Sequence, residues 1–234
     1  MSPAPLAERL AVVAGASRGI GLAFADALAG AGAHVVRLAR SLRDAEQDRR
    51  TDIACDVTRA ESVAAAAGRI LAGRGAPDLL VIASGGFLLK PLAETTSTEF
   101  AEQLGANLAG PFALLRAFVG PMRERGTGLV VTIGSIADHA ALPGNAAYAA
   151  SKHGLRGLYG VLAAELVGSG VRASLVSPGP VDTGLWDPVD PDARPGFTKR
   201  RDMLRPQDVA EAVLFLATRP PHVTIPTLTI EPLR

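Results

Sequence analysis

A glycine-rich turn follows the first apolar run of the sequence and restricts what its N-terminal part can form. Residues 11–21 read AVVAGASRGIG, and apolar residues continue at Leu22, Phe24, Ala25 and Leu28. This pattern predicts a strand, a tight turn and a helix whose first backbone N–H groups are open to a phosphate. The glycine spacing is G-x-x-x-G-x-G and not the general dinucleotide fingerprint G-x-G-x-x-G, so a plain strand-to-helix turn is the alternative.

Strand-like and helix-like patterns alternate along the rest of the chain. Such alternation predicts an α/β fold, a Rossmann-like doubly wound parallel sheet with helices on both faces. We expect strands near residues 9–14, 34–38, 52–55, 78–83, 128–133, 171–176 and 226–230. We expect helices near residues 19–30, 59–73, 97–124, 147–168 and 206–218. The highly charged connection 39–51 leaves room for little more than a loop, and 1–234 reads as a single domain with a substantial core.

Charge and cysteine content exclude several classes of protein. The net charge is +1, which provides no strong field for nucleic acid or an anionic membrane. A lone cysteine, Cys55, excludes an internal disulfide and is compatible with a reducing compartment. No apolar run approaches the roughly 18 residues of a membrane span, and no leader pattern opens the sequence. We therefore expect a cytoplasmic protein that binds neither nucleic acid nor membranes.

A hydroxyl residue precedes a Tyr-x-x-x-Lys pair in the second half of the chain. Tyr148 and Lys152 lie one helical turn apart on one face. An ammonium group beside a phenol favours the phenolate and lowers the phenol pKa from its usual value near 10. Ser135 would then hydrogen-bond the oxygen of a carbonyl or alcohol placed between it and Tyr148. Taken alone, Tyr and Lys at this spacing are usually only surface neighbours, which is the alternative.

The order and spacing of these motifs resemble the short-chain dehydrogenase/reductase family over nearly the whole chain. The resemblance implies an oxidoreductase in which Ser135, Tyr148 and Lys152 are catalytic. It also implies that the glycine-rich turn binds the phosphates of a nicotinamide dinucleotide. The expected cofactor contacts in that turn are Gly15, Ser17, Arg18, Gly19, Ile20 and Gly21.

Asn107 completes the catalytic set that the resemblance implies. Pro111 has no N–H, so the main-chain carbonyl of Asn107, four residues earlier, loses its helical partner. In the family, an Asn at this position lies at a helix kink, and its freed carbonyl holds a water. The implied proton relay runs from the substrate oxygen through Tyr148, the cofactor ribose and Lys152 to that water. A surface Asn before a kinking proline is the alternative.

The end of the second strand indicates which dinucleotide binds. The segment 34–38 is followed by Ala39-Arg40-Ser41. NAD-selective sites place an acidic residue near this point, whereas an Arg accommodates the 2′-phosphate of NADP. A guanidinium group suits phosphate because its planar donors bind two oxygens at once. We therefore predict NADP(H), bound by Arg40 and Ser41 with help from Ser17 and Arg18, unless Arg40 points to solvent.

Further cofactor contacts rest on the resemblance alone. The expected contacts are Asp56 and Val57 near adenine, Ala83 and Gly85 near the adenosine ribose, and Pro178, Gly179, Val181 and Thr183 near the nicotinamide. Asp56 equally suits a cap of the following helix through Thr58. The segment 82–85 reads IASG where the family has Asn-Asn-Ala-Gly, so the side-chain amides that tie neighbouring backbones there are missing.

The remaining candidates concern the substrate side. Residues 184–205 are rich in proline and charge and are predicted to form a substrate-loop or lid, with the basic cluster 199–201 as a solvated face. His139 lies where family members build the substrate pocket, and a polar loop histidine is an equal alternative. The four His residues and Cys55 show no metal-ligand spacing, so we predict no metal.

These observations predict an NADPH-dependent reductase that converts a ketone of a small molecule to a secondary alcohol, reversibly. The alternatives are a 3-oxoacyl-[acyl-carrier-protein] reductase and a non-catalytic NADP(H)-binding regulator. A homotetramer, or failing that a homodimer, is expected because the family pairs the helices at 97–124 and 147–168. Their exposed faces would carry Phe112, Leu158 and Leu162. Substrate choice depends on the loops around Phe87, His139, Leu142 and Trp186.

Overall fold

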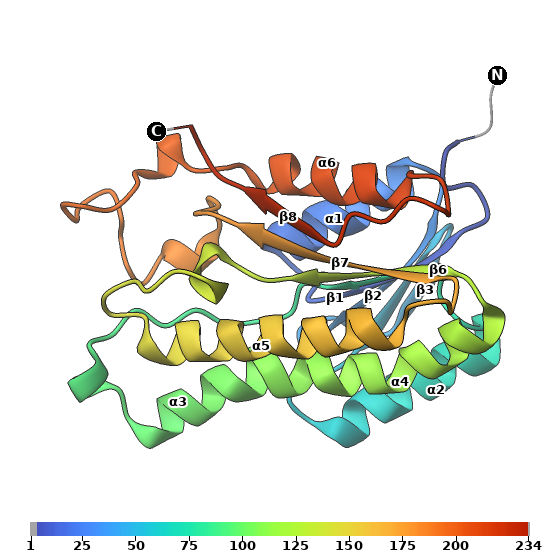
Figure 1. The fold of residues 1–234 in the computed structure, drawn as a ribbon, viewed down its shortest axis with the longest axis horizontal. Helices are drawn as coiled ribbons and strands as arrows, with labels where there is room; N and C mark the ends of the chain where they lie inside the picture. The colour runs from blue at the N-terminus through green and yellow to red at the C-terminus, as the bar shows by residue number, and fades with distance from the viewer. Residues whose placement is uncertain (1–3, 234) are drawn as a thin grey trace.

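An eight-stranded sheet runs through the middle of the protein (Figure 1). The structure is a computed structural model, and it describes residues 4–233. Residues 1–3 and 234, the two ends of the predicted 1–234 domain, lie outside the described residues. The strands are β1 (Leu10–Ala14), β2 (His34–Ala39), β3 (Ala45–Gln47), β4 (Arg50–Ala54), β5 (Leu79–Ile82), β6 (Gly128–Ile133), β7 (Val171–Pro178) and β8 (Thr227–Ile230). Their order is β3-β4-β2-β1-β5-β6-β7-β8, and every neighbouring pair except β3–β4 is parallel.

The chain first builds the sheet outward from β1 to β4 and then returns to β5 on the other side of β1. The loops that follow β1 and β5 therefore leave the sheet in opposite directions. Ligands bind beside such a reversal, beyond the carboxyl ends of the strands. Those ends point to the left in Figure 1.

Helices cover both faces of the sheet, as predicted. They are α1 (Gly19–Gly30), α2 (Ala60–Arg74), α3 (Ser97–Leu104), α4 (Gly110–Arg125), α5 (Ala146–Glu165) and α6 (Pro206–Ala217). Helices α1 and α6 lie above the sheet in Figure 1, and α2, α4 and α5 lie below it. Alternate strand residues point to opposite layers, so Val12 packs with the α2/α4/α5 layer and Val13 with the α1/α6 layer. Within residues 4–233, none of these helices has the length and apolar character that crossing a bilayer requires.

The charged connection 39–51 forms more structure than predicted. Its residues Ala45–Gln47 make the antiparallel strand β3, which pairs with β4 across a turn where Arg49 has a φ of 54°. The connection therefore adds one antiparallel strand to the edge of the predicted parallel sheet. Charged side chains hold the hairpin to α2 through two ion pairs, Asp44–Arg69 and Glu46–Arg74. Charges of this kind also protect an edge strand from pairing with another chain.

The long helix predicted at 97–124 is interrupted in the middle. Helix α3 begins with a capping box, in which Thr96 and Glu99 each accept a hydrogen bond from the other's backbone N–H. A π-helical turn occupies Gly105–Ala109, and α4 starts at Gly110 with Pro111 in its first turn. Pro111 has no N–H to donate to the carbonyl of Asn107, so one bond of the regular ladder is missing where the π-helical turn lies.

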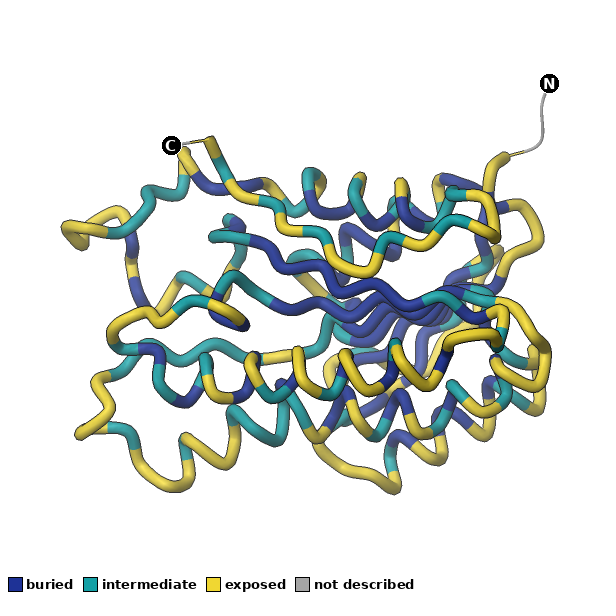
Figure 2. The backbone as a smooth tube through the Cα atoms, in the orientation of Figure 1, coloured by how far each residue is buried: buried dark blue, intermediate teal, exposed yellow. Residues whose placement is uncertain are grey.

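Burial differs from the prediction on the outer side of α5. Figure 2 shows buried strands and helices whose outer faces are exposed. Leu162 is buried and continues an apolar stripe with Leu155, Tyr159 and Leu166 that faces the core. Leu158 is half-buried against the same core, so neither leucine belongs to an exposed face as predicted. Phe112 does lie on the surface, with 52% of it exposed.

A buried ion pair joins β2 to β4, and the sequence analysis did not identify it. Arg37 Nε donates to Asp52 Oδ1 at 2.7 Å, and a second guanidinium nitrogen donates to Asp52 Oδ2 at 2.6 Å. Both side chains are about nine-tenths buried. The hydrogen bond from Arg37 holds the pKa of Asp52 below its ordinary value, although burial acts against it.

We predict that Asp52→Ala lowers the free energy of unfolding by about 3–5 kcal/mol, because it leaves the Arg37 charge buried without its partner. The pKa of Asp52 is lower in the folded than in the unfolded chain. The pair therefore stabilises the fold above the unfolded pKa near 4, and its contribution disappears as the pH falls through the folded pKa. Urea unfolding at pH 7 and at lower pH measures both effects. Glu124→Ala, at an exposed position on α4, is the control, and equal losses in the two variants would contradict the prediction.

Candidate active site

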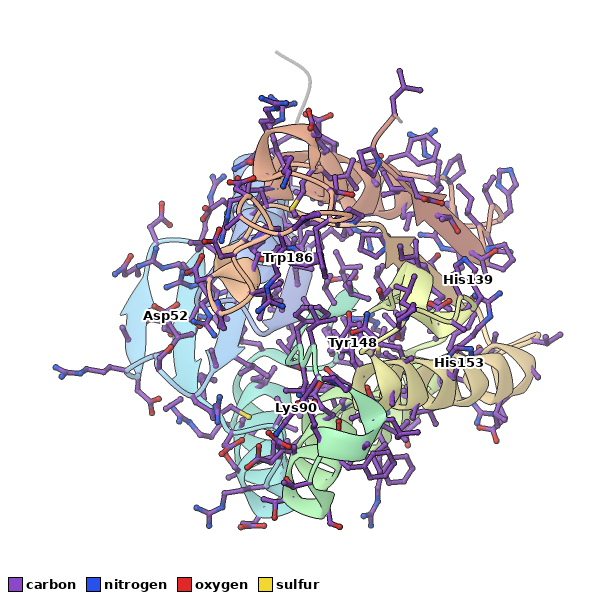
Figure 3. All side chains as sticks on the ribbon, turned by 90° about the vertical axis from the view of Figure 1, so that its left-hand side faces the viewer. Asp52, Lys90, His139, Tyr148, His153 and Trp186 are labelled. Atoms are coloured by element: carbon purple, nitrogen blue, oxygen red, sulfur yellow. The ribbon has the colours of Figure 1, made fainter. Side chains whose placement is uncertain are left out.

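A cleft of about 1510 Å³ opens at the carboxyl ends of the strands. It is larger than the about 300–1,000 Å³ of a usual small-molecule site, so it has room for a dinucleotide and a second molecule. Figure 3 looks at this end of the protein, with Tyr148 and Trp186 toward its middle. Every residue predicted to bind cofactor or to act in catalysis lines the cleft. They are Gly15, Ser17, Arg18, Gly19, Ile20, Gly21, Arg40, Ser41, Asp56, Val57, Ala83, Gly85, Asn107, Ser135, Tyr148, Lys152, Pro178, Gly179, Val181 and Thr183.

The glycine-rich turn after β1 leaves no space for side chains at two of its glycines. Gly15 has a φ of 84°, and a Cβ on it would lie 2.7 Å from the backbone nitrogen of Ser84. A Cβ on Gly21 would lie 2.1 Å from the carbonyl oxygen of Gly15. Helix α1 therefore starts close against the turn. Its N-cap residue, Arg18, makes no side-chain hydrogen bond to the first turn, so the backbone N–H groups there suit an anion.

The residues that follow the carboxyl ends of β2 and β4 line one corner of the cleft, where Arg40 supplies a positive charge. Arg40 and Ser41 are exposed and follow the buried Ala39. Asp56 accepts hydrogen bonds from the backbone N–H of Thr58 at 3.0 Å and from its hydroxyl at 2.7 Å. Burial raises the pKa of Asp56, but these hydrogen bonds and the charge of Arg40 outweigh it, so the pKa lies below its ordinary value. Asp56 thus holds the turn before α2 and lines the cleft. It does not cap α2 as the alternative had it, because the N-cap position is Arg59 and no side chain caps the helix there.

Ser135, Tyr148 and Lys152 come together at the centre of the cleft. Ser135 follows β6, and its hydroxyl hydrogen-bonds the phenol of Tyr148 in the first turn of α5. One turn further along α5, the Lys152 ammonium lies 5.7 Å from the centre of the Tyr148 ring. It donates to the carbonyl oxygen of Ile133 at 3.0 Å, and Lys152 is only 5% exposed.

The electrostatics of this group differ from the prediction. Burial raises the pKa of Tyr148, and the hydrogen bond from Ser135 acts in the opposite direction without cancelling it. Burial also lowers the pKa of Lys152 to about 8. The prediction that the pKa of Tyr148 lies below its ordinary value was therefore wrong. Desolvation of the phenolate dominates, and the lysine ammonium is engaged by the Ile133 carbonyl.

Asn107 is fully buried, which rules out the reading of it as a surface residue. Its side-chain oxygen accepts from Gly86 N at 2.9 Å, and its amide nitrogen donates to Gly86 O at 3.1 Å. The same nitrogen donates to Ser151 Oγ on α5 at 3.0 Å. Asn107 therefore ties the loop after β5 to α5. Its side-chain amide, which comes from the π-helical turn, bonds the backbone just after the segment 82–85, which has no side-chain amide of its own. The role of its main-chain carbonyl in holding a water stays a prediction.

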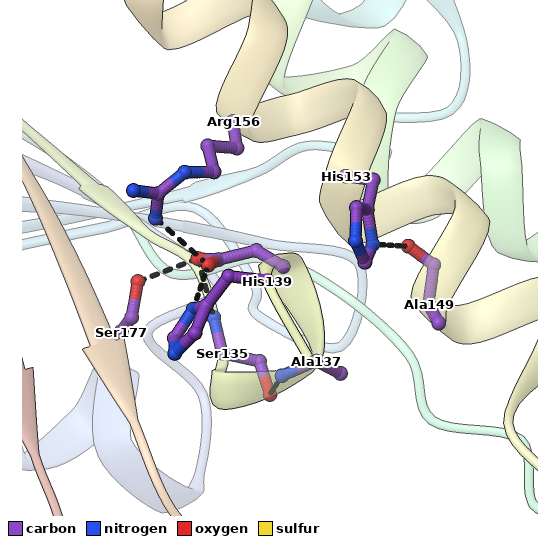
Figure 4. Close-up of polar contacts among 8 residues, drawn as sticks. Ser135, Ala137, His139, Ala149, His153, Arg156 and Ser177 are labelled. Atoms are coloured by element: carbon purple, nitrogen blue, oxygen red, sulfur yellow. Dashed lines mark hydrogen bonds and ion pairs between the residues drawn. The ribbon is translucent and has the colours of Figure 1, made fainter. Parts of the chain in front are cut away.

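Asp138 is a buried carboxylate that was not among the predicted site residues. Figure 4 labels its partners Ser135, His139, Arg156 and Ser177. Its Oδ1 accepts from His139 Nδ1 at 2.6 Å and from Arg156 at 3.0 Å. Its Oδ2 accepts from the Ser177 hydroxyl and, at 3.3 Å, from the backbone N–H of Ser135. Burial alone would raise the pKa of Asp138, but these hydrogen bonds and the Arg156 charge lower it. The carboxylate thus connects the Ser135 loop to both α5 and β7.

His139 lies outside the cleft lining, so its predicted place in the substrate pocket was wrong. Its ring is bonded to Asp138, and 42% of the side chain is exposed (Figure 4). It is a loop histidine, as the alternative had it. Among the described residues, no group of three or more His, Cys, Asp and Glu side chains is placed to hold a metal ion.

Similar proteins are known. A family model described as enoyl-(acyl carrier protein) reductase matches residues 15–224. D-threitol dehydrogenase of Mycolicibacterium smegmatis is 37% identical over 223 residues, which cover 90% of this chain and 86% of that protein. A metagenomic short-chain oxidoreductase, solved in complex with NADP, is 33% identical with a TM-score of 0.79, over 98% of this chain and all of the other. An alcohol dehydrogenase from Thermococcus sibiricus, complexed with 5-hydroxy-NADP, is 30% identical with a TM-score of 0.83, over 97% of both chains.

We predict that Asp138→Asn lowers kcat by up to about 100-fold, because a small displacement of the Ser135 loop misplaces its hydroxyl. The Asp138 charge also raises the pKa of both Lys152 and Tyr148. Its removal should therefore lower both values and move the pH–rate profile to lower pH. Steady-state rates from pH 6 to 10 measure both effects. Asp26→Asn, at an exposed position on α1, serves as the control, and a profile that keeps its wild-type position would argue against the role of the charge.

Proposed function

The chain belongs to the short-chain dehydrogenase/reductase family, and we propose that it uses NADPH to reduce a ketone of a small molecule to a secondary alcohol, reversibly. One observation carries the proposal. The Ser135 hydroxyl bonds the Tyr148 phenol in the same cleft as a glycine-rich turn that is open to a dinucleotide phosphate. The activity as an oxidoreductase acting on alcohol and carbonyl groups agrees with the dehydrogenases to which the chain is similar.

The residues of the cleft fit NADP(H). The close approaches at Gly15 and Gly21 form a cradle that a Cβ would fill, and the first turn of α1 opens onto it. The Ser84 hydroxyl is buried without a hydrogen-bond partner among the described residues, so it has a donor to offer a bound group. Arg40 and Ser41 would hold the 2′-phosphate. Similar solved proteins hold NADP or 5-hydroxy-NADP. When bound, the nicotinamide supplies or accepts a hydride.

The protein's own groups handle the proton. Ser135 and Tyr148 would both hydrogen-bond the carbonyl oxygen and so fix its position. The raised pKa of Tyr148 keeps the phenol protonated at neutral pH, ready to donate its proton to that oxygen. Lys152, with a pKa of about 8, is mostly protonated at neutral pH. Its ammonium beside the ring stabilises the phenolate that remains after the transfer.

The alternatives receive less support. An acidic carrier protein would dock on a basic patch beside the site. On α5, however, Lys152 is buried and Arg156 is bonded to Asp138, so the helix offers no such patch. A regulator that only binds NADP(H) has no need of the hydrogen bond between Ser135 and Tyr148.

Self-association is part of the proposal. Phe112 on α4 and Val161 on α5 are more than half exposed, at 52% and 58%. Pairing of the α4 and α5 faces of two copies would cover both residues and produce a homodimer, and a second interface would make a homotetramer.

We predict that Tyr148→Phe reduces turnover by roughly 100- to 10,000-fold, because it removes the proton donor, and leaves NADPH affinity within a few-fold. NADPH oxidation against a panel of ketones, quinones and acyl thioesters identifies the substrate for this assay. Tyr159→Phe is the matched control, since the hydroxyl of Tyr159 bonds the carbonyl oxygens of Ala173 and Pro226 outside the cleft. Near-normal turnover in Tyr148→Phe would overturn the assignment of the general acid.

We predict that Arg40→Ala weakens NADPH binding by about one to two decades and leaves NADH binding almost unchanged. A lost charge-assisted contact costs about 1.5–3 kcal/mol, and only NADPH carries the phosphate that makes it. Arg43→Ala is the control, because Arg43 is exposed on the same connection but does not line the cleft. Fluorescence titration of both cofactors measures the affinities. Equal binding of NADH and NADPH by the wild-type protein would mean that Arg40 points to solvent.

A further inference from the structure

Four aromatic rings gather at one end of the cleft. Phe87, in the loop after β5, meets Tyr148 edge to face, with ring centres 5.0 Å apart and an interplanar angle of 86°. Trp186, from the loop after β7, lies 5.1 Å from Phe87, and Phe197 lies 6.4 Å from Trp186. The chain has only seven Phe, two Tyr and one Trp, so this grouping takes up a large share of its aromatic residues. Phe87, Trp186 and Phe197 all line the cleft, and we call them the aromatic wall.

Outside the phosphate and adenosine end, the cleft lining is apolar or uncharged except for Glu102 and Lys152. The apolar side chains that line the cleft with it are Leu89, Leu142, Pro143, Leu185 and Pro195. The polar residues Gln103 and Asn145, which also line the cleft, carry no charge. The surface that the second molecule meets therefore provides contact area more than hydrogen bonds.

The charged residues that line the cleft are not placed to bind an anionic substrate at the aromatic wall. Among the described residues, the charged ones in its lining are Arg18, Arg40, Asp56, Glu102 and Lys152. The first three belong to the loops of the phosphate and adenosine end. Lys152 bonds the Ile133 carbonyl, and Glu102 would repel an anion. An anionic substrate thus finds no cation at the aromatic wall within the part of the chain that the structure describes.

Three cations close to the aromatic wall in sequence, although outside the cleft lining, already have partners: Arg200, Lys199 and Lys90. Arg200 bonds Asp182 at 2.7 Å and Asp187 at 2.6 Å, which places its guanidinium across the segment that carries Trp186. Lys199 donates to the carbonyl oxygens of Pro191, Asp192 and Arg194. Lys90, near Phe87 in sequence, bonds both carboxylate oxygens of Glu99.

The same contacts hold the loop 184–205 in place. Trp186 sits in a 3-10 turn, Gly184–Trp186, whose N-cap Thr183 accepts from Leu185 N and from Trp186 N. With Arg200 bonded on both sides of this turn, the indole is held beside Phe87 without a ligand. A surface that is already ordered loses little conformational entropy on binding, so its contacts count almost fully toward affinity.

We propose that the substrate is an uncharged aryl ketone, whose ring packs against Phe87 and Trp186 while its carbonyl oxygen reaches Ser135 and Tyr148. The proposal rests on the proposed ketone reduction. Aromatic rings favour edge-to-face and offset contacts with other rings, which is the kind of surface that the wall offers. A carboxylate or phosphate on the substrate would be desolvated there without a partner, and a polyol would lose hydrogen bonds to water. Phe87 and Trp186 are therefore the residues that determine specificity.

Paired substrates test the choice of ring. NADPH oxidation is measured with acetophenone, with 2-butanone and with the anion 4-acetylbenzoate. We expect kcat/KM for acetophenone to exceed that for 2-butanone by about 10- to 100-fold, which corresponds to burial of one ring. It should also exceed kcat/KM for 4-acetylbenzoate, whose carboxylate would be desolvated without a partner. Trp186→Ala should remove most of the acetophenone advantage, measured as the ratio of the kcat/KM values for acetophenone and 2-butanone. Trp186→Phe should restore it, and Phe215→Ala, at an exposed ring on α6, is the control.

A binding measurement separates this inference from the proposed function. Trp186 is the only tryptophan of the chain, so its fluorescence reports directly on the wall. In Tyr148→Phe with saturating NADP⁺, 1-phenylethanol should change the emission at lower concentration than 2-butanol by tenfold or more. Ketone turnover with no preference for the aryl compounds, or with a preference that Trp186→Ala leaves intact, would overturn the aryl assignment alone. Aryl-selective binding without turnover of any ketone would instead overturn the reaction.

Discussion

Close backbone contact between the turn after β1 and the loop after β5 sets the geometry of the whole cleft. Any side chain at Gly15 would strike Ser84, and any at Gly21 would strike Gly15. With these contacts in place, α1 points its N-terminus at the cleft floor. Asn107 extends the arrangement by bonding both backbone groups of Gly86 and then Ser151 on α5. These bonds fix the position of α5, the helix that carries Tyr148 and Lys152, relative to the phosphate-binding turn.

Buried charges in this protein each have a defined partner, and two of them shape the catalytic end. Lys152 is buried beside Tyr148, and burial lowers its pKa to about 8. Asp138 opposes that effect at a distance, while its own charge is compensated by Arg156 and by hydrogen bonds from Ser177, His139 and the Ser135 backbone. One carboxylate therefore both anchors the Ser135 loop and helps to keep the lysine protonated.

The two ends of the cleft differ in chemistry. Arg18 and Arg40, together with the open first turn of α1, make one end suited to phosphate. The other end is walled by Phe87, Trp186 and Phe197. Of the cations near it, Arg200 is paired with Asp182 and Asp187, and Lys199 donates to backbone carbonyls. This difference supports the proposal that the cofactor phosphate and a neutral, ring-bearing substrate occupy opposite ends of the cleft.

The sequence by itself determined the α/β class and the layers of helices, and its resemblance to a family indicated the cofactor and catalytic residues among those that line the cleft. These depend on local patterns, since motifs placed directly after parallel strands must meet at one edge of the sheet. Only the tertiary structure decided the antiparallel β3, the burial of Leu162, the position of His139 outside the cleft and the clamp that Asn107 makes on Gly86. It also decided the direction of the Tyr148 pKa and the partners of Asp138. Each of these depends on which distant side chains meet and on how much water they exclude, and neither quantity is encoded in the spacing of residues along the chain.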